Sequence, residues 1–173
     1  MIKIIGLLNL KELFIFKSPE ANKENAIEAA YKFSEDGANG IAVYGKTFSE
    51  RKTIANLLKP KLDIPVNPII TSEKQIESLP YEKIFFSIKK IKSLNREIIF
   101  TREITEIEIF KENNIAILVT NKKALKVFNS EPDYVDEIVS LMTCKAVLKN
   151  VKFFLTENVL SARKGAEICK KLF

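Results

Sequence analysis

Short apolar runs alternate with amphipathic segments along the whole chain. The apolar runs have the length of β-strands and lie at residues 2–8, 40–44, 64–70, 83–88, 97–101, 115–119 and 151–156. Between most of them, apolar residues recur at the three- and four-residue spacing of a helix that buries one face. Such an order is typical of a parallel sheet covered by helices. The pattern predicts a single β/α domain over residues 1–173, because no linker or low-complexity segment interrupts it.

Capping signals mark where the helices begin. Ser18 followed by Pro19 predicts the start of the first helix, which Gly37 ends. Thr105 and Glu108 form a capping box for a later helix. Further helices are predicted from residue 72 and over residues 49–61, 122–128, 134–149 and 159–172.

Two prolines distinguish the third predicted strand from the others. Pro65 and Pro68 lack the backbone N–H that a central strand donates on one of its sides. This strand is therefore expected at an edge of the sheet. The total of seven strands suits either a reduced barrel or an open doubly wound sheet, and periodicity alone does not choose between them.

The chain is basic, with a net charge of +6. The lysines are spread along it, which favours an ordinary Lys-rich surface, while an anionic ligand and RNA remain alternatives. One basic cluster comprises Lys83, Lys89, Lys90, Lys92 and Arg96. No aromatic RNA-binding signature accompanies this cluster, so we do not expect nucleic acid as the main partner.

Residue types that are missing exclude several kinds of chemistry. The chain has no histidine and only two cysteines, Cys144 and Cys169. Imidazole catalysis and zinc sites are thereby excluded, and we expect no metal and no cofactor. Both cysteines lie in apolar helical patterns, which predicts buried thiols rather than a disulfide. No apolar run reaches the ~18 residues of a membrane span, and no leader pattern is seen, so a cytoplasmic protein is expected.

The two ends of the chain carry motifs that are found together in a known family. Gly6-Leu-Leu-Asn9-Leu is similar to the Gly-Ile-Leu-Asn-Val that opens dihydropteroate synthase and related pterin-binding proteins. Residues 35–43, Glu-Asp-Gly-Ala-Asn-Gly-Ile-Ala-Val, resemble their Glu-Gly-Ala-Asp-Ile-Ile-Asp-Val. Residues 153–172 resemble their final strand and helix. The resemblance implies a (β/α)₈ barrel, which typically takes about 250 residues, so this chain is expected to form a shortened or incomplete TIM-type barrel.

The resemblance also allows the site to be compared position by position. Asn9 matches the asparagine that lies beside the metal and the diphosphate of the pterin substrate. Ala42 stands where the family has the aspartate of its second strand, and Ser49 where it has a loop arginine. In the last strand, Leu155 replaces an arginine and Glu157 a histidine. The resemblance therefore implies a degenerate active site.

Polar residues at the ends of the predicted strands are the candidate ligand-binding residues. We assign none of them a catalytic role. The candidates are Asn9, Lys46, Thr71, Lys89, Arg102, Asn121 and Glu157. Each could equally cap a helix or face water, since Ser, Thr and Asn are preferred helix caps.

We interpret the chain as a relative of dihydropteroate synthase that lacks synthase activity and binds a small anionic or pterin ligand or a protein partner. One alternative is an active transferase of folate or methanopterin synthesis with an altered site. A second alternative is a basic RNA-associated protein. A barrel that lacks a strand would leave unpaired edges, so a homodimer is also expected.

Overall fold

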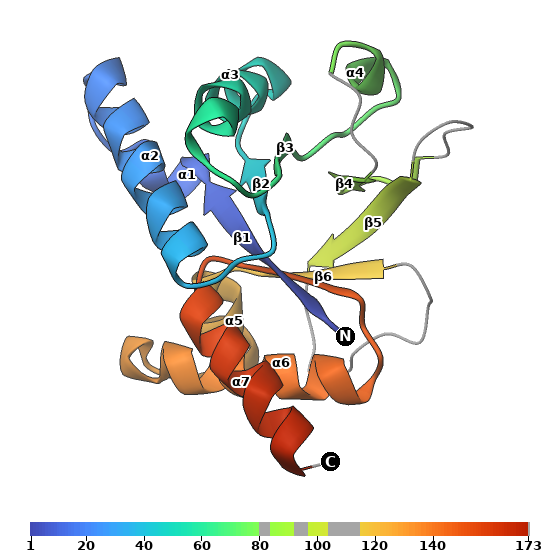
Figure 1. The fold of residues 1–173 in the computed structure, drawn as a ribbon. Coiled ribbons are helices and arrows are strands. Elements are labelled where there is room, and N and C mark those ends of the chain that lie inside the picture. Colours follow the sequence, from blue (N-terminus) through green and yellow to red (C-terminus); the bar gives the residue numbers. More distant parts are fainter. Residues whose placement is uncertain (80–83, 92–96, 104–114, 173) are drawn as a thin grey trace.

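The computed structural model describes residues 1–79, 84–91, 97–103 and 115–172, with the side chains of Glu103 and Ile115 left out. Its seven strands form one parallel sheet (Figure 1). They are β1 (Lys3–Asn9), β2 (Ile41–Tyr44), β3 (Val66–Pro68), β4 (Ile84–Ser87), β5 (Glu97–Glu103), β6 (Ile115–Val119) and β7 (Phe153–Thr156).

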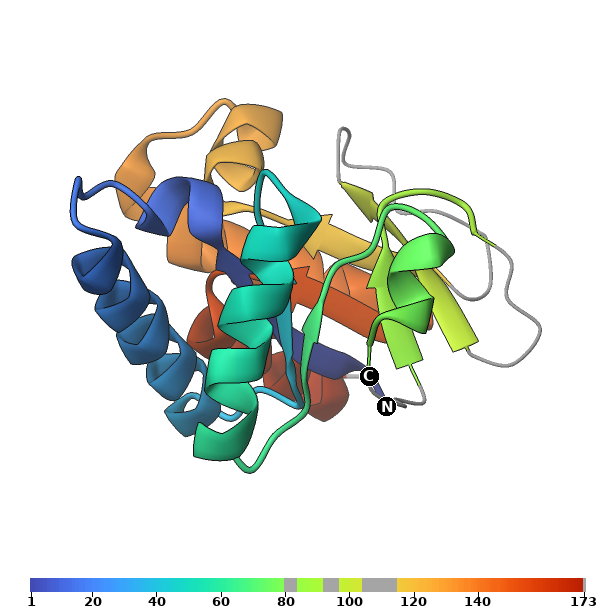
Figure 2. The same ribbon diagram turned by 90° about the horizontal axis from the view of Figure 1, so that it is seen from above.

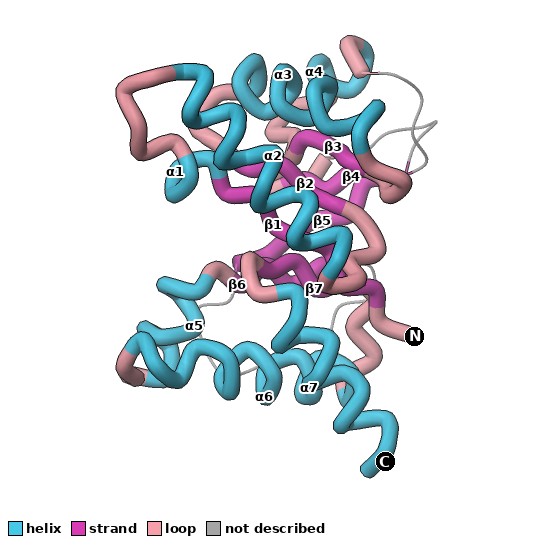
Figure 3. The backbone as a smooth tube through the Cα atoms, turned by 60° about the vertical axis from the view of Figure 1, so that its left-hand side comes forward, coloured by secondary structure: helices cyan, strands magenta, loops and turns pink. Residues whose placement is uncertain are grey.

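Helices follow most of these strands. They are α1 (Leu10–Leu13), α2 (Pro19–Glu35), α3 (Phe48–Leu58), α4 (Lys74–Glu77), α5 (Asn121–Phe128), α6 (Val135–Leu148) and α7 (Val159–Leu172), with short 3₁₀ turns at Lys59–Lys61 and Pro132–Tyr134. Helices α2 and α3 cover one side of the strands, and α5, α6 and α7 cover the other (Figure 3).

The sheet is a nearly closed barrel. Its order, β3-β2-β1-β7-β6-β5-β4, is the order of neighbours around a ring. The two ends of this order meet just past β3, where Ile70 forms a parallel bridge with Ser87 of β4. There the Ile70 N–H donates to Phe86 O at 2.9 Å, and Ser87 Oγ donates to Ile70 O at 3.1 Å. Seen from above, β4 and β5 lie on the opposite side of the molecule from α2 (Figure 2).

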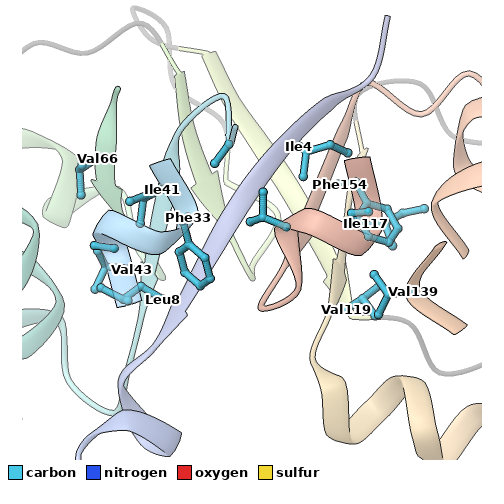
Figure 4. Packing of buried hydrophobic residues seen from close by; sticks show 14 of the residues in the cluster. Ile4, Leu8, Phe33, Ile41, Val43, Val66, Ile117, Val119, Val139 and Phe154 are labelled. Carbon is cyan, nitrogen blue, oxygen red and sulfur yellow. The ribbon is translucent and has the colours of Figure 1, made fainter. Parts of the chain in front are cut away.

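Alternate side chains of the strands form two separate apolar cores. One set points into the barrel and makes the inner core of Ile5, Leu7, Ala42, Ile69, Phe86, Ile99, Ala116, Leu118, Phe153 and Leu155. The other set points outward and packs under the helices, as Ile4, Leu8, Val43, Ile117 and Phe154 do (Figure 4). Both sets are needed because a parallel strand inside such a barrel is buried on both faces.

Two glycines allow helices to lie close to neighbouring elements. A Cβ on Gly6 of β1 would lie 2.6 Å from the ring of Phe33 on α2, so the phenyl ring occupies the space that a side chain would need. A Cβ on Gly165 of α7 would lie only 2.1 Å from the backbone oxygen of Ser140 on α6. Helices α6 and α7 are therefore in direct backbone contact at this point.

Most predicted elements are confirmed. The structure contains all seven strands, with β3 at an end of the sheet order as its prolines predict. Ser18 caps α2 as expected, its Oγ accepting the Ala21 N–H. The sequence pattern missed α1, which is a single turn directly after β1. The helix predicted from the capping box of Thr105 and Glu108 lies outside the described residues.

Both cysteines are free thiols, as predicted. Cys169 on α7 is buried as expected, whereas Cys144 on α6 is only partly buried. Cys169 Sγ donates to the carbonyl oxygen of Cys144 at 3.4 Å. Burial and a hydrogen bond with the Cys169 side chain raise the pKa of the Cys144 thiol to about 11. Among the described residues, no helix is long and apolar enough to cross a membrane.

Candidate functional site at the mouth of the barrel

Three of the seven candidate residues meet at the carboxyl end of the barrel. Asn9 is the last residue of β1, Glu157 follows β7, and Asn121 is the first residue of α5. Asn9 Nδ2 donates to Glu157 Oε1 at 2.8 Å, and the Asn121 backbone N–H donates to Glu157 Oε2 at 2.8 Å. One carboxylate therefore joins β1, β7 and α5 across the mouth.

The alternation of the strands explains why these groups converge. On β1, Ile5 and Leu7 point into the barrel, so Asn9 follows them at the same two-residue spacing. On β7, Phe153 and Leu155 point inward, and Glu157 is next in that series. Because the strands are parallel and adjacent, both series end on the same rim. The polar pair is thus the top layer of the inner core.

Asn9 is held from a second side by α1. Its Oδ1 accepts the Lys11 N–H at 3.3 Å, which caps this one-turn helix. Lys11 Nζ in turn donates to the Tyr44 hydroxyl at 3.2 Å and lies 4.7 Å from the centre of its ring. Tyr44, at the end of β2, is half-buried and packs against the inner core. The mouth therefore carries a lysine and an aromatic ring beside the Asn9–Glu157 pair.

The other four candidates do not join this cluster. Lys46 has an exposed side chain, and its backbone N–H donates to Glu50 Oε2 at 3.0 Å. Thr71 is hydrogen-bonded to Gln75, to which its N–H donates at 2.8 Å. Lys89 is exposed beside Ser87. Arg102 on β5 is exposed and out of phase with inward-pointing Ile99.

Two residues near the mouth are not among the candidates that the sequence predicts. Lys11 gave no signal, because a single helical turn is too short to show a periodic pattern. Arg51 of α3 is 97% buried, since only 3% of its surface is exposed. Its Nη1 donates to Gly45 O at 2.9 Å and so holds the loop after β2. Burial lowers the pKa of Arg51 from its ordinary value.

Metal ligation is not supported by the donor atoms of the cluster. A hard cation such as Mg²⁺ needs several free oxygen ligands. Asn9 Oδ1 accepts the Lys11 N–H and each oxygen of Glu157 accepts one hydrogen bond, so the cluster offers a metal a single carboxylate with one lone pair left on each oxygen. In the described part of the chain, no three His, Cys, Asp or Glu side chains group in a way that could hold a metal. The metal that the sequence resemblance implies beside Asn9 therefore does not fit these residues.

Solved structures share this architecture over almost the whole chain. Dihydropteroate synthase from Clostridium difficile, in the presence of pteroic acid, matches with a TM-score of 0.74 at 13% identity, covering 99% of this chain and 97% of that one. This chain has the dihydropteroate synthase fold. The Xanthomonas albilineans enzyme with 4-aminobenzoic acid matches with a TM-score of 0.74 at 8% identity, covering 99% of this chain and 92% of that one. The predicted resemblance is thereby confirmed for the fold.

A third synthase of the same fold comes from Coxiella burnetii, in complex with pteroic acid. It matches with a TM-score of 0.72 at 9% identity, covering 98% of this chain and 92% of that one. Comparison by sequence gives no match to a family model and none to a curated protein. The likeness to dihydropteroate synthases thus lies in how the chain folds, while the side chains have diverged widely.

Replacing Asn9 with aspartate tests the contact across the mouth. Two carboxylates would then face each other where Asn9 Nδ2 now donates to Glu157. We expect Asn9→Asp to lower the free energy of unfolding by about 2 kcal/mol at pH 7, because like charges at this distance repel. At pH 4 protonation relieves the repulsion, so the difference from the wild type should shrink.

Urea denaturation of both proteins at the two pH values measures this change. Asn67→Asp is not a suitable control, because Asn67 is buried, and Asn56→Asp on α3, where the side chain is exposed, serves instead. An equal loss of stability for Asn9→Asp at pH 4 and pH 7 would contradict the prediction.

Proposed function

We propose that this protein is a dihydropteroate synthase-related binding protein that holds a pterin-type ligand at the mouth of its barrel and lacks synthase activity. The observation that carries the proposal is the Asn9–Glu157 hydrogen bond. The asparagine that resembles a diphosphate-binding residue of the synthases is bonded here to a carboxylate of its own chain. A synthase must instead stabilise the charge of its diphosphate substrate with donors and cations.

The interior of the barrel supports the loss of catalysis. Ala42 stands where the synthases have an aspartate, and none of its surface is exposed. Leu155, in place of an arginine, is equally buried within the inner core. Apolar side chains therefore fill the positions from which polar groups would reach a substrate, and a buried ligand N–H would find no acceptor there.

The mouth nevertheless offers groups that suit a planar heterocycle. A pterin ring carries N–H donors along one edge, and a carboxylate such as Glu157 is a strong acceptor for them. The Tyr44 ring, at the end of β2, would provide an aromatic face for stacking once Lys11 Nζ, which lies 4.7 Å from the centre of the ring, moves aside. The solved structures of this fold include synthases with pteroic acid bound, which supports a pterin-type ligand. A small anion is less well supported, because it would meet the Glu157 carboxylate.

Complementation tests the absence of synthase activity. We expect that expression of this chain in a bacterium lacking dihydropteroate synthase will not restore growth without added folate products. An active synthase expressed from the same vector is the control. Growth of the strain at a rate above the empty vector would overturn this part of the proposal and favour the alternative of an active transferase.

Titration with pteroic acid tests the binding site. We expect the wild type to bind, and Tyr44→Ala to weaken binding about fivefold, since loss of an aromatic contact costs on the order of 1 kcal/mol. Tyr31→Ala is the matched control, because Tyr31 is an exposed tyrosine of α2. Tyrosine fluorescence or calorimetry gives the affinity. Equal effects of the two substitutions, or no binding by the wild type, would contradict the proposal.

We also propose that the protein pairs with a second copy through α6 and α7. Unpaired strand edges are not the reason for this dimer, because the bridge between Ile70 and Ser87 brings the two ends of the sheet together. Large apolar side chains instead remain exposed on these helices and at their start: Tyr134, Leu141, Leu148, Leu160, Ile168 and Leu172. Three of them recur every seven residues along α6.

Charge favours a second copy of this chain as the partner. The start of α6 is acidic, with Asp136 and Glu137, and the end of α7 is basic, with Lys170 and Lys171. In a two-fold dimer, the acidic start of α6 in one copy can face the basic end of α7 in the other copy, and the reverse. The exposed apolar residues would then be removed from water at the same interface.

Leu141→Lys tests this dimer. Leu141 is 63% exposed in the middle of α6, and a lysine there would put an unpaired charge into the interface. We expect a dimer for the wild type and a monomer for Leu141→Lys in light scattering at micromolar concentration. Ile15→Lys is the matched control, because Ile15 is 71% exposed between α1 and α2. A monomeric wild type would overturn the proposal.

A further inference from the structure

The Glu157 carboxylate sits in a cradle of donors from two elements. Asn9 Nδ2 of β1 and the Asn121 N–H of α5 each lie 2.8 Å from one of its oxygens. Asn121 is the first residue of α5, so the carboxylate also lies at the positive end of this helix. Two directed donors and a helix N-terminus are what proteins use to hold the oxygens of phosphate groups.

One neighbouring lysine adds positive charge near this cradle. Lys11 lies on the far side of Asn9, and its Nζ reaches the Tyr44 hydroxyl at the same mouth. Thr120 Oγ1 accepts the Lys123 N–H at 3.2 Å and leaves the Asn121 N–H to Glu157. Without Glu157, the mouth would present Asn9 Nδ2, the Asn121 N–H and a lysine with no carboxylate among them.

We infer that Glu157 is a specificity-determining residue, a built-in anion that occupies the cradle in place of a phosphate group of the ligand. The wild-type mouth then selects ligands without a phosphate. A phosphate would find Asn9 Nδ2 and the Asn121 N–H already bonded to Glu157, and it would be repelled by the Glu157 carboxylate. This inference rests on the proposed ligand site at the mouth and deepens it: the pterin-type ligand is bound in a form that lacks phosphate.

Removing the carboxylate tests the inference with inorganic pyrophosphate as the probe. We expect Glu157→Ala to bind pyrophosphate at least about tenfold more tightly than the wild type in calorimetry, since charge-assisted donors become free. The double variant Asn9→Ala/Glu157→Ala should lose this gain. Glu167→Ala is the matched control: Glu167 lies on α7, its side chain is 60% exposed, and its loss changes the net charge equally.

Equal pyrophosphate affinity of Glu157→Ala and Glu167→Ala would overturn the inference. Retention of the full gain in the double variant would do so as well, because the donors of the cradle would then be irrelevant. Circular dichroism checks that each variant folds. If Glu157→Ala does not fold, Glu157→Gln takes its place with Glu167→Gln as control, and the same comparison decides.

The pyrophosphate experiment uses no pterin, so it is independent of the proposed function. Failure of the wild type to bind pteroic acid would remove the pterin ligand but leave the cradle to be judged by pyrophosphate alone. A gain of pyrophosphate binding together with pteroic acid binding by the wild type would establish both. In that case the wild type should also prefer a pterin over the same pterin carrying a diphosphate.

Discussion

Seven parallel strands that curve into a ring must be apolar on both faces, and this requirement governs the rest of the molecule. The inner core fills the ring, and the outer core holds the helices. Polar side chains inside the strands are therefore few, and buried Asn67 of β3 and Thr101 of β5 are among them. Asn9 and Glu157 occupy the next inward positions after Leu7 and Leu155, at the end of the inner core. The candidate site is thus limited to the rim by the packing below it.

The same constraint explains how much could be predicted from the sequence. Strands such as 115–119 and helices such as 159–172 are visible because burial imposes a period on them. The parallel order follows from their alternation, and Pro65 and Pro68 place β3 at an edge of the sheet order. The closure through Ile70 and Ser87 could not be predicted, because one backbone bridge leaves no pattern in the sequence.

The candidate site was predictable only in part, for a related reason. Asn9 and Glu157 come from strands that are neighbours in the ring, so their meeting follows from the order of the strands. Arg102 was a candidate because it is a cation near the end of a predicted strand. Side chains alternate along β5, and since Ile99 points into the barrel, Arg102 points away from it. No sequence signal marks Arg51, because an arginine on an amphipathic helix usually faces water. Arg51 is buried because it donates to the backbone carbonyl of Gly45 in the loop after β2. Every residue has such a carbonyl group, so the sequence does not indicate which one an arginine will bind.

The pairing of β1 with β7 has a consequence for how the chain is made. Residues 3–6 of β1 pair with residues 153–156 of β7, almost at the other end of the sequence. During synthesis, β1 can pair with β2 early, but its second edge has to wait for β7. Until then a strand of apolar residues presents unpaired N–H and C=O groups. The ring can therefore close only after β7 has been made, and one edge of β1 stays unpaired until then.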